Sequence, residues 1–383
     1  MKIVDVEAIW LRVPAIGQRC EWGEDALIVR IHTDNGLIGI GETDSAPAVV
    51  KALIEMPSSH ETCQGLRDVL IGENPLEIDR LWQKMYRQTE YVGRRGAGIH
   101  AISALDIALW DIAGKFYNVP IHTLLGGKYR DRIPAYGTFI PRPDEAGNRD
   151  VLGTLLDQGL TSIKLGGGGF GDNPIKDKQL LKIVRGEIGP DIQLQIDLVG
   201  RWRNAPHAIA QCEALREFDL NWIEEPLPSD DSQGLLRLAK FAGIPVAGGE
   251  GLATRHEFAV FLESTHPDIV QPDITRCGGI SEMMHISSLA KRHGARLVPH
   301  GFSTGILLAA TTHFLAASEH GDLLEYSQSD SPLFHSLNSL AGHRDSGLFE
   351  LSAGVLRYLR PGRQSHLVVR GTQDLRLPGV PIL

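Results

Sequence analysis

Cysteine is scarce in this chain, and its spacing excludes two common kinds of site. There are 4 cysteines in 383 residues, and no two of them form a C-x-x-C pair. A disulfide framework needs more cysteines, and a zinc or redox site needs closer ones. We therefore expect ordinary thiols of a reducing compartment at Cys20, Cys63, Cys212 and Cys277.

Long apolar runs and an excess of positive charge are missing as well. No stretch approaches the roughly 18 apolar residues that a membrane span needs. The first ten residues, MKIVDVEAIW, lack the apolar core of a signal peptide. The 38 basic and 47 acidic side chains give a net charge of −9, whereas binders of nucleic acid or anionic membranes present a basic surface. We expect a cytoplasmic protein with no nucleic-acid and no membrane partner.

The first third of the chain places a sheet before a group of helices. Residues 25–42 alternate between apolar and polar side chains around Asn35-Gly36, which predicts two strands joined by a two-residue hairpin turn. Residues 98–115 carry a broad apolar face and predict a long helix. Strands followed by helices, without alternation, indicate an α+β domain at residues 1–128.

Near residue 130 the pattern changes to short β-rich runs that alternate with single helical segments. Such alternation predicts a parallel sheet, and at this length a closed barrel is favoured over an open doubly wound sheet. We predict an α/β fold, a modified TIM (β/α) barrel at 129–345 with the α+β unit as an N-terminal capping domain. A C-terminal segment, 346–383, would pack back on that domain. The predicted strands are 133–140, 161–165, 192–197, 220–224, 244–250, 268–273, 295–300 and 322–326.

Five acids and one histidine stand at or near the ends of the last six predicted strands, 23 to 27 residues apart. A barrel brings the carboxyl ends of its strands together at one mouth, where active sites lie. A single acid at a strand end is usually a solvated or capping residue, but six polar residues at equivalent positions indicate a site. They are Asp197, Glu224, Glu250, Asp273, His300 and Glu325.

Three carboxylates that converge on one point cannot all stay ionised without a cation between them. Oxygen ligands of this kind suit a hard ion, for which Mg²⁺ is the natural candidate. We assign Asp197, Glu224 and Glu250 to this ion. Glu225 follows Glu224 directly, and alternation along a strand lets only one of the two point into the barrel. The sequence barely decides which one does.

Asp273 and His300 come from the next two strands and can lie side by side. A carboxylate bonded to one imidazole nitrogen fixes the tautomer and leaves the other nitrogen as a general base. Lys164 ends the second predicted strand, where it can neutralise a substrate carboxylate or accept a proton. The ordinary alternatives are a structural histidine bonded to the backbone and a lysine that extends from the rim into solvent.

Taken together, these residues resemble the enolase superfamily, specifically its mandelate racemase subgroup, over nearly the whole chain. The resemblance implies that the three assigned carboxylates bind Mg²⁺, that Asp273 and His300 form a dyad, and that Glu325 donates to the enolate oxygen. It also implies removal of a proton α to a carboxylate, with the ene-diolate stabilised by the metal and by hydrogen-bond donors. The motifs that carry it are AISALDIALWDIAGK (101–115), WIEEP (222–226), VAGGE (246–250), QPDITRCGG (271–279), LVPHGF (297–302) and LLEY (323–326).

Two departures from the subgroup bear on the reaction. Lys164 matches the first lysine of the K-x-K on the second strand, but Gly166 stands where the second lysine often is. The third strand reads Asp197-Leu198-Val199 instead of D-x-N or D-x-H, so a polar group beside the metal is missing. A racemase needs bases on both faces of the carbanion, whereas a single histidine can remove the α-proton and then protonate a departing β-hydroxide on the same face.

The missing base therefore favours dehydration, as in the acid sugar dehydratases that this chain resembles. The predicted function is a Mg²⁺-dependent hydro-lyase of an aldonate or aldarate that yields a 2-keto-3-deoxy acid. Two alternatives stay open. One is a racemase or epimerase of a 2-hydroxy acid that uses Lys164 as its second base, and the other is a catalytically silent acid-sugar-binding protein.

The glycine run LGGGGFG (165–171) formally contains the G-x-G-x-x-G of dinucleotide-binding proteins. A Rossmann loop opens its helix at once, but here D-N-P intervenes before the helical pattern, so a nucleotide-dependent oxidoreductase is disfavoured. Specificity would come from capping loops around 18–22 and 43–47. Arg19 is a candidate contact for a distal carboxylate or hydroxyl of the substrate, and the ordinary alternative is a solvated loop arginine. We expect a homo-oligomer that takes a small-molecule carboxylate substrate.

Overall fold

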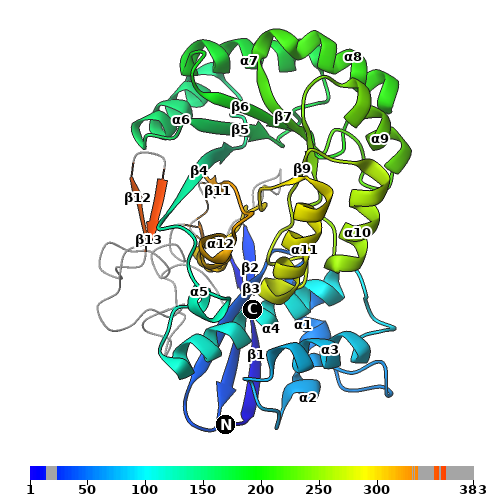
Figure 1. The fold of residues 1–383 in the computed structure, drawn as a ribbon, viewed down its shortest axis with the longest axis vertical. Coiled ribbons are helices and arrows are strands. Elements are labelled where there is room, and N and C mark those ends of the chain that lie inside the picture. The colour runs from blue at the N-terminus through cyan, green and yellow to red at the C-terminus, as the bar shows by residue number, and fades with distance from the viewer. Residues whose placement is uncertain (14–23, 330, 332, 335–348, 353–354, 359–383) are drawn as a thin grey trace.

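The protein consists of a capping domain and a barrel, which stack along the long axis of the molecule (Figure 1). The computed structural model describes residues 1–13, 24–329, 331, 333–334, 349–352 and 355–358. Within these residues the predicted fold class is confirmed, because a curled parallel sheet with outer helices follows an antiparallel N-terminal sheet.

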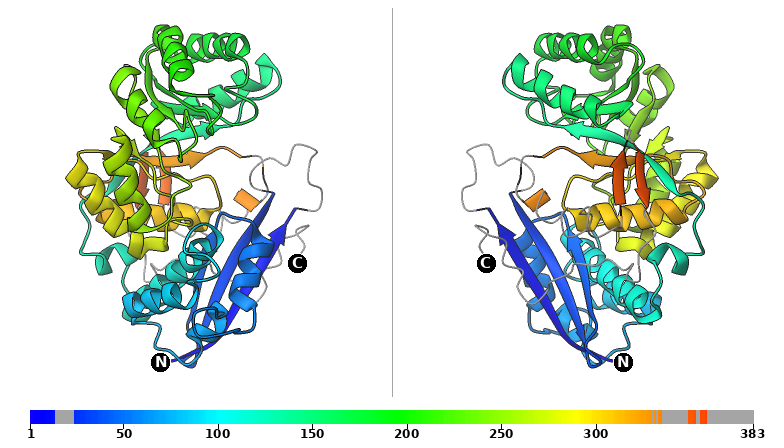
Figure 2. Two further views of the ribbon diagram at one scale, coloured as in Figure 1. Left: turned by 90° about the vertical axis from the view of Figure 1, so that its right-hand side faces the viewer. Right: turned by 90° about the vertical axis from the view of Figure 1, so that its left-hand side faces the viewer.

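The capping domain begins with three antiparallel strands in the order β1-β2-β3. They are β1 (Ile3–Arg12), β2 (Asp25–Thr33) and β3 (Ile38–Thr43). In the side views these strands extend from the N-terminal end of the molecule toward the barrel (Figure 2). The helices that follow are α1 (Pro47–Glu55), α2 (Leu66–Leu70), α3 (Ile78–Gln88), α4 (Ala97–Tyr117) and α5 (Ile121–Leu124).

The predicted hairpin is present, but its turn is longer than two residues. The backbone N–H of Thr33 donates to Leu37 O, and that of Gly36 donates to Thr33 O, so three residues separate the last paired positions. Gly36 has a φ of +84°, the left-handed conformation that a three-residue hairpin requires at this position. The Asn35-Gly36 pattern was therefore right about the hairpin and wrong about the turn.

Helix α4 is the central helix of the capping domain. It is the one helix among the described residues that is long and apolar enough to cross a membrane, but 83% of the apolar window lies buried inside the protein. Strand β3 approaches this helix very closely: a Cβ on Gly41 would lie 1.9 Å from Ala104 O, and one on Gly39 would lie 2.1 Å from Ala108 O. The two glycines of IGIGE thus allow the sheet and the helix to pack in direct contact.

All eight predicted barrel strands are present and parallel, and the structure shortens several of them. Neighbours pair in sequence order from β4 to β10, and β11 pairs with β4. A bridge between Leu297 and Gly321 links β10 to the segment that leads into β11, which closes the ring. The strands are β4 (Arg132–Phe139), β5 (Ser162–Gly166), β6 (Gln193–Asp197), β7 (Leu220–Glu224), β8 (Val246–Gly248), β9 (Ile269–Val270), β10 (Arg296–Leu297) and β11 (Leu324–Ser327).

Helices cover the outside of the barrel, and α11 and α12 lie between it and the capping domain (Figure 1). Beyond β11 the described hairpin β12 (Phe349–Ser352) and β13 (Val355–Tyr358) pairs with β4 through β13. Residues 359–383 lie outside the described residues, so the domain limits and the predicted C-terminal return stay predictions. The barrel helices are α6 (Glu145–Asp157), α7 (Pro174–Ile188), α8 (Ala205–Leu215), the 3₁₀ turn η1 (Arg216–Phe218), α9 (Ser232–Phe241), α10 (Thr254–Thr265), α11 (Gly279–His293) and α12 (Gly305–Ala317).

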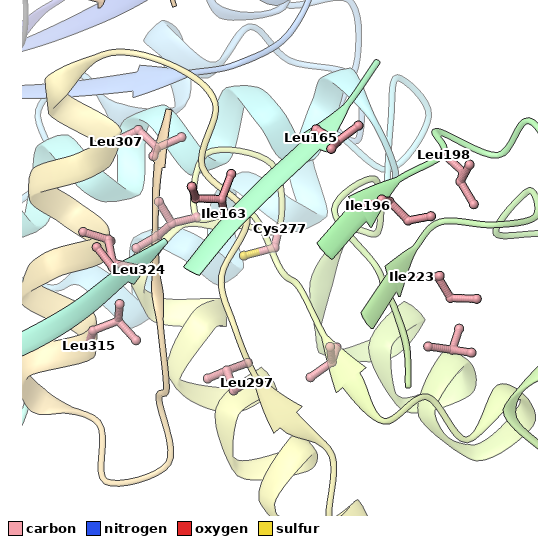
Figure 3. Packing of buried hydrophobic residues seen from close by; sticks show 14 of the residues in the cluster. Ile163, Leu165, Ile196, Leu198, Ile223, Cys277, Leu297, Leu307, Leu315 and Leu324 are labelled. Carbon is pink, nitrogen blue, oxygen red and sulfur yellow. The ribbon is translucent and has the colours of Figure 1, made fainter. Parts of the chain in front are cut away.

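Alternation along the strands divides the barrel core into two layers. Ile163, Leu165, Ile196 and Ile223 belong to the outer layer, where strands pack against helices (Figure 3). A separate inner cluster fills the barrel and contains Tyr136, Trp222, Ala247, Ile269 and Val298. Because Ile163 and Leu165 lie on the outer face, the residue between them belongs to the inner face.

Candidate active site

A polar cavity lies at the carboxyl ends of the barrel strands, where the sequence predicted the site. Its empty volume is about 470 Å³. Five of the seven predicted site residues line it directly, and the other two, Glu224 and Asp273, lie buried against them. The lining residues are Thr138, Ile140, Lys164, Gly166, Gly167, Asp197, Val199, Glu250, Arg276, His300, Phe302 and Glu325.

The structure brings the three predicted metal ligands together. Asp197, Glu224 and Glu250 each offer a carboxylate oxygen, and these atoms lie within 4.8 Å of one another. Glu224 is fully buried in this group, whereas Glu225 has a φ of +39° and lines a different cavity, next to Leu235. The choice between the two glutamates, which the sequence left open, is thus made by the backbone bend after β7.

The electrostatics of this group suit a cation. Burial and the neighbouring charge of Glu224 raise the pKa of Asp197 to about 8, and burial also raises the pKa of Glu224. Hydrogen-bond donors outside the cluster orient two of the carboxylates. The Val199 N–H donates to Asp197 Oδ1 at 3.0 Å, and Gln271 Nε2 donates to Glu224 Oε2 at 2.7 Å. Three oxygen donors, the raised pKa values of Asp197 and Glu224, and outer hydrogen bonds fit a hard divalent ion.

Lys164 lies between the acidic cluster and Glu325. Its side chain is 1% exposed, so the alternative of a solvated rim lysine is excluded. Nζ donates to Glu224 Oε1 and to Glu325 Oε1, the latter at 2.9 Å, and lies 3.9 Å from Asp197 Oδ2. Burial alone would lower the pKa of Lys164, but Glu224 and Glu325 together raise it well above its usual range. In this arrangement Lys164 is an ammonium ion.

His300 and Asp273 form the predicted pair. His300 Nδ1 donates to Asp273 Oδ2 at 2.7 Å, and His300 Nε2 lies 3.4 Å from Glu250 Oε2. The other oxygen of Asp273 accepts from the N–H and the hydroxyl of Thr275, at 2.7 and 2.6 Å. Burial opposes charge on the imidazole, but Glu250 and Glu325 raise the pKa of His300 to about 10. A backbone-bonded structural histidine is therefore excluded.

Glu325 lies next to both basic groups and is held by three donors. Thr138 Oγ1 and Lys164 Nζ donate to Oε1 at 2.6 and 2.9 Å, and the Gly301 N–H donates to Oε2 at 2.9 Å. Burial opposes the charge, but Lys164 and His300 lower the pKa of Glu325 to about 2. Donation to an enolate oxygen requires a protonated carboxyl, so that role stays a prediction that depends on proton uptake.

Two residues of the site were missed by the sequence reasoning. Arg276 Nη1 donates to Glu250 Oε1 at 3.0 Å, and its guanidinium also pairs with Asp44 of the capping domain. Its place in QPDITR, three residues after Asp273, is a signal that could have identified it. Asp44 itself confirms that the 43–47 loop reaches the site, whereas residues 18–22, including Arg19, lie outside the described residues.

The glycine run forms a loop and does not open a helix directly, as a Rossmann glycine loop does. Gly167, Gly168, Gly169 and Gly171 all have positive φ, from +56° to +99°, and helix α7 begins only at Pro174. Gly167 lines the cavity, as expected for a loop that leaves space at the rim. The G-x-G-x-x-G match is therefore coincidental.

Comparison with known families agrees with this geometry. Residues 15–126 match the mandelate racemase / muconate lactonizing enzyme N-terminal domain, and residues 149–355 match the enolase C-terminal domain-like family. The second match alone spans more than half of the chain. The protein belongs to the enolase superfamily, in its mandelate racemase subgroup, and is related to enzymes that act on acid sugars.

Individual relatives show how the reactions of this group vary. The chain is 34% identical over 295 residues to a D-galactarolactone cycloisomerase of Agrobacterium fabrum, and the aligned region covers 76% of this chain and 75% of the relative. It is 32% identical over 304 residues to an L-rhamnonate dehydratase of Saccharopolyspora erythraea, covering 78% and 72%. The structure of a 3,6-anhydro-D-galactonate cycloisomerase from Zobellia galactanivorans is similar with a TM-score of 0.82, 29% identity and coverage of 95% and 96%. A racemase from Streptomyces coelicolor, determined with bound magnesium, gives a TM-score of 0.77 with 27% identity and coverage of 94% and 96%.

Proposed function

We propose that the protein is a Mg²⁺-dependent dehydratase of an acid sugar, an aldonate or aldarate. The proposal rests on one observation: the candidate base, His300, lies on one side of the site, and position 166 provides no second base. His300 is paired with Asp273, while position 166, where a second lysine would stand, has no room for a side chain: a Cβ there would lie 2.4 Å from the Cβ of Asp197. A single base suits removal of a proton and loss of a hydroxyl on the same face.

Asp197, Glu224 and Glu250 would hold the ion, since their oxygen atoms lie within 4.8 Å of one another. Mg²⁺ would supply positive charge that makes the proton α to a carboxylate more acidic. The similarity to a racemase structure with bound magnesium supports this choice. The pKa of His300 would fall when a divalent cation offsets the charge of Glu250, which brings the imidazole closer to the neutral form that a base requires.

In the proposed reaction, His300, Asp273 and Lys164 would each have a separate role. His300 Nε2 takes the α-proton, and Asp273 holds the opposite nitrogen and stabilises the imidazolium. The same Nε2 proton passes to the departing β-hydroxyl, which leaves as water, and the resulting enol tautomerises to the 2-keto-3-deoxy acid. Lys164, a buried ammonium ion among the residues that line the cavity, provides fixed positive charge for the substrate carboxylate.

A second candidate is a ring-opening isomerase of a sugar lactone or anhydro sugar acid. Two of the similar proteins described above are cycloisomerases, and elimination of a β-oxygen that belongs to a ring needs the same single base. The racemase or epimerase is a weaker candidate, because Lys164 is engaged with Glu224 and Glu325 and Gly166 provides no base. A silent binding protein would keep the cavity without turnover.

One experiment separates these functions. The Mg²⁺-loaded protein is incubated with a panel of aldonates, aldarates and their lactones in D₂O. Semicarbazide and mass spectrometry then follow the products. A dehydratase gives a keto acid that has lost water, a cycloisomerase gives a keto acid of unchanged formula, and an epimerase gives α-deuterium without a ketone. The absence of all three products, together with saturable ligand binding, would contradict the proposal and favour the binding protein.

We further propose that the partners of this chain are its small-molecule substrate and other copies of itself. Multi-angle light scattering of the purified protein gives the mass of the assembly, and a monomer would contradict the second part. The cytoplasmic location stays a prediction from the sequence.

A further inference from the structure

Three consecutive residues at the end of strand β3, Glu42-Thr43-Asp44, reach from the capping domain to the catalytic pair. Glu42 is fully buried, and its carboxylate accepts from residues that follow His300 in the chain. Thr304 donates through its N–H at 3.1 Å and its hydroxyl at 2.5 Å, the Leu307 N–H donates at 3.0 Å, and the Ser303 hydroxyl donates as well. Glu42 thereby binds the N-cap Thr304, four residues beyond His300, and the first turn of α12.

The next two residues bind the segment that follows Asp273. The Thr43 hydroxyl donates to Thr275 O at 2.8 Å, and the Asp44 N–H donates to Thr275 Oγ1 at 3.1 Å. The same Thr275 hydroxyl donates to Asp273 Oδ1 at 2.6 Å, so one side chain joins the capping domain to the carboxylate of the dyad. The Asp44 carboxylate pairs with Arg276, which in turn contacts Glu250.

Strand β3 is well placed to act as a rigid support. The close approach of Gly41 to Ala104 O fixes the strand against α4. Asp111 of that helix accepts from the Ile40 N–H at 2.9 Å, and Lys115 donates to Ile38 O at 2.6 Å. The backbone that presents the three residues is therefore held by α4 and, through strand pairing, by β2.

We propose that Glu42, Thr43 and Asp44 are positioning residues that set the geometry between His300 and Asp273, so that catalysis depends on the docked capping domain. The inference rests on the proposed function, because it takes this pair to be the base. The two partners come from different loops, one after β9 and one after β10, and β3 is a single element that bonds to both. A shift of about 1 Å in a catalytic group can lower the rate about 10²-fold.

The test uses two isosteric variants of buried carboxylates at the same domain interface. Glu42→Gln removes the anion that binds α12. Asp106→Asn is the matched control, because Asp106 lies fully buried on α4 and accepts from the N–H and hydroxyl of Ser281, at 3.0 and 2.6 Å, in the first turn of α11. We expect kcat to fall about 10²-fold in Glu42→Gln, with KM and the Mg²⁺ dissociation constant within about threefold of the wild type. Asp106→Asn should keep kcat within about threefold at the same temperature.

A second pair tests the contact of Thr43 with Thr275, the residue whose hydroxyl donates to Asp273. Thr43→Val removes the hydroxyl without changing the shape of the side chain, and Thr43→Ser restores the hydroxyl. We expect kcat to fall in the valine variant and to recover in the serine variant. Equal losses in the two Thr43 variants, an unchanged kcat in Glu42→Gln, or an equal loss in Asp106→Asn would overturn the proposal and leave only a general role in domain docking.

A readout without substrate separates this inference from the proposed function. The Nδ1–H proton of His300, bonded to Asp273, should give a downfield proton resonance that is identified by its loss in His300→Asn. We expect this resonance to shift or broaden in Glu42→Gln and to stay in place in Asp106→Asn. If no acid sugar is turned over, the proposed function fails while this comparison still decides the positioning role, and an unshifted resonance in Glu42→Gln overturns it.

Discussion

A Cβ on Gly166 would lie 2.4 Å from the Cβ of Asp197, the residue that pairs with Gly166 across the neighbouring strands β5 and β6. Real Cβ atoms do not approach so closely, so the strand end that carries a metal-ligand candidate also requires glycine beside it. A lysine could therefore not simply be put back at position 166, because the surrounding packing leaves no space for its side chain.

Gly166→Ala should disturb the ion site rather than the fold. The added methyl must shift Asp197, and loss of the support that orients a metal ligand typically weakens metal binding about 10- to 100-fold. Isothermal titration with Mg²⁺ measures this loss. Gly153→Ala in α6 is the control, because no atom lies within 4 Å of the new Cβ, and it should raise stability by about 0.5–1 kcal/mol without changing affinity. Unchanged Mg²⁺ affinity in Gly166→Ala would show that Asp197 is not a ligand.

His300→Asn should abolish both keto-acid formation and exchange of the α-proton with D₂O. Loss of a general base lowers the rate by about 10²- to 10⁴-fold. Asp273→Asn keeps the imidazole but loses the carboxylate that accepts its Nδ1–H, so a comparable loss of kcat is expected with KM little changed. Both rates are measured on the substrate found in the panel. Retained exchange in His300→Asn would show that another residue takes the proton.

Lys164→Met should separate ion binding from turnover. Lys164 Nζ is the cation that now neutralises Glu224 and Glu325. Its removal leaves more negative charge near the proposed ion site, so Mg²⁺ should bind more tightly, while kcat falls because the substrate carboxylate loses its positive partner. Titration calorimetry and initial rates give the two values. Weaker Mg²⁺ binding in this variant, at unchanged thermal stability, would contradict the electrostatic role of Lys164.

The buried histidine of α12 should make stability depend on pH. Burial lowers the pKa of His313 to about 3, and the side chain is 1% exposed. The unfolded chain, with an ordinary histidine pKa near 6.5, then binds more protons than the folded protein below that pH, so stability falls as the pH drops from 6.5 toward 3. Between pH 7 and pH 5 the loss is about 2 kcal/mol.

Urea unfolding of the wild type and His313→Gln at the two pH values measures this loss. The stability advantage of the wild type over the variant should shrink by that amount at pH 5. The exposed His293 at the end of α11 provides the control, and His293→Gln should show a difference that does not change with pH. A constant difference for His313→Gln would mean that His313 is not buried in its neutral form.

The sequence alone was enough to predict the barrel strands and the polar residues at their carboxyl ends. The eight barrel strands and helix α4 follow from apolar patterns whose period is local, and the site residues follow from one rule, that parallel strand ends converge. Asp197, Glu250, Asp273, His300 and Glu325 could be selected in this way without any contact being known.

Only the tertiary structure decided how those residues pair. The choice of Glu224 over Glu225 depends on a backbone bend, and the ammonium state of Lys164 depends on two carboxylates 60 and 161 residues away. The contacts of Glu42 and Asp44 with the loops after β10 and β9 join residues more than 230 positions apart. Sequence patterns report which face a residue occupies, but charge states and contacts between domains arise from distances through space. These distances are set when the barrel closes and when the two domains pack together.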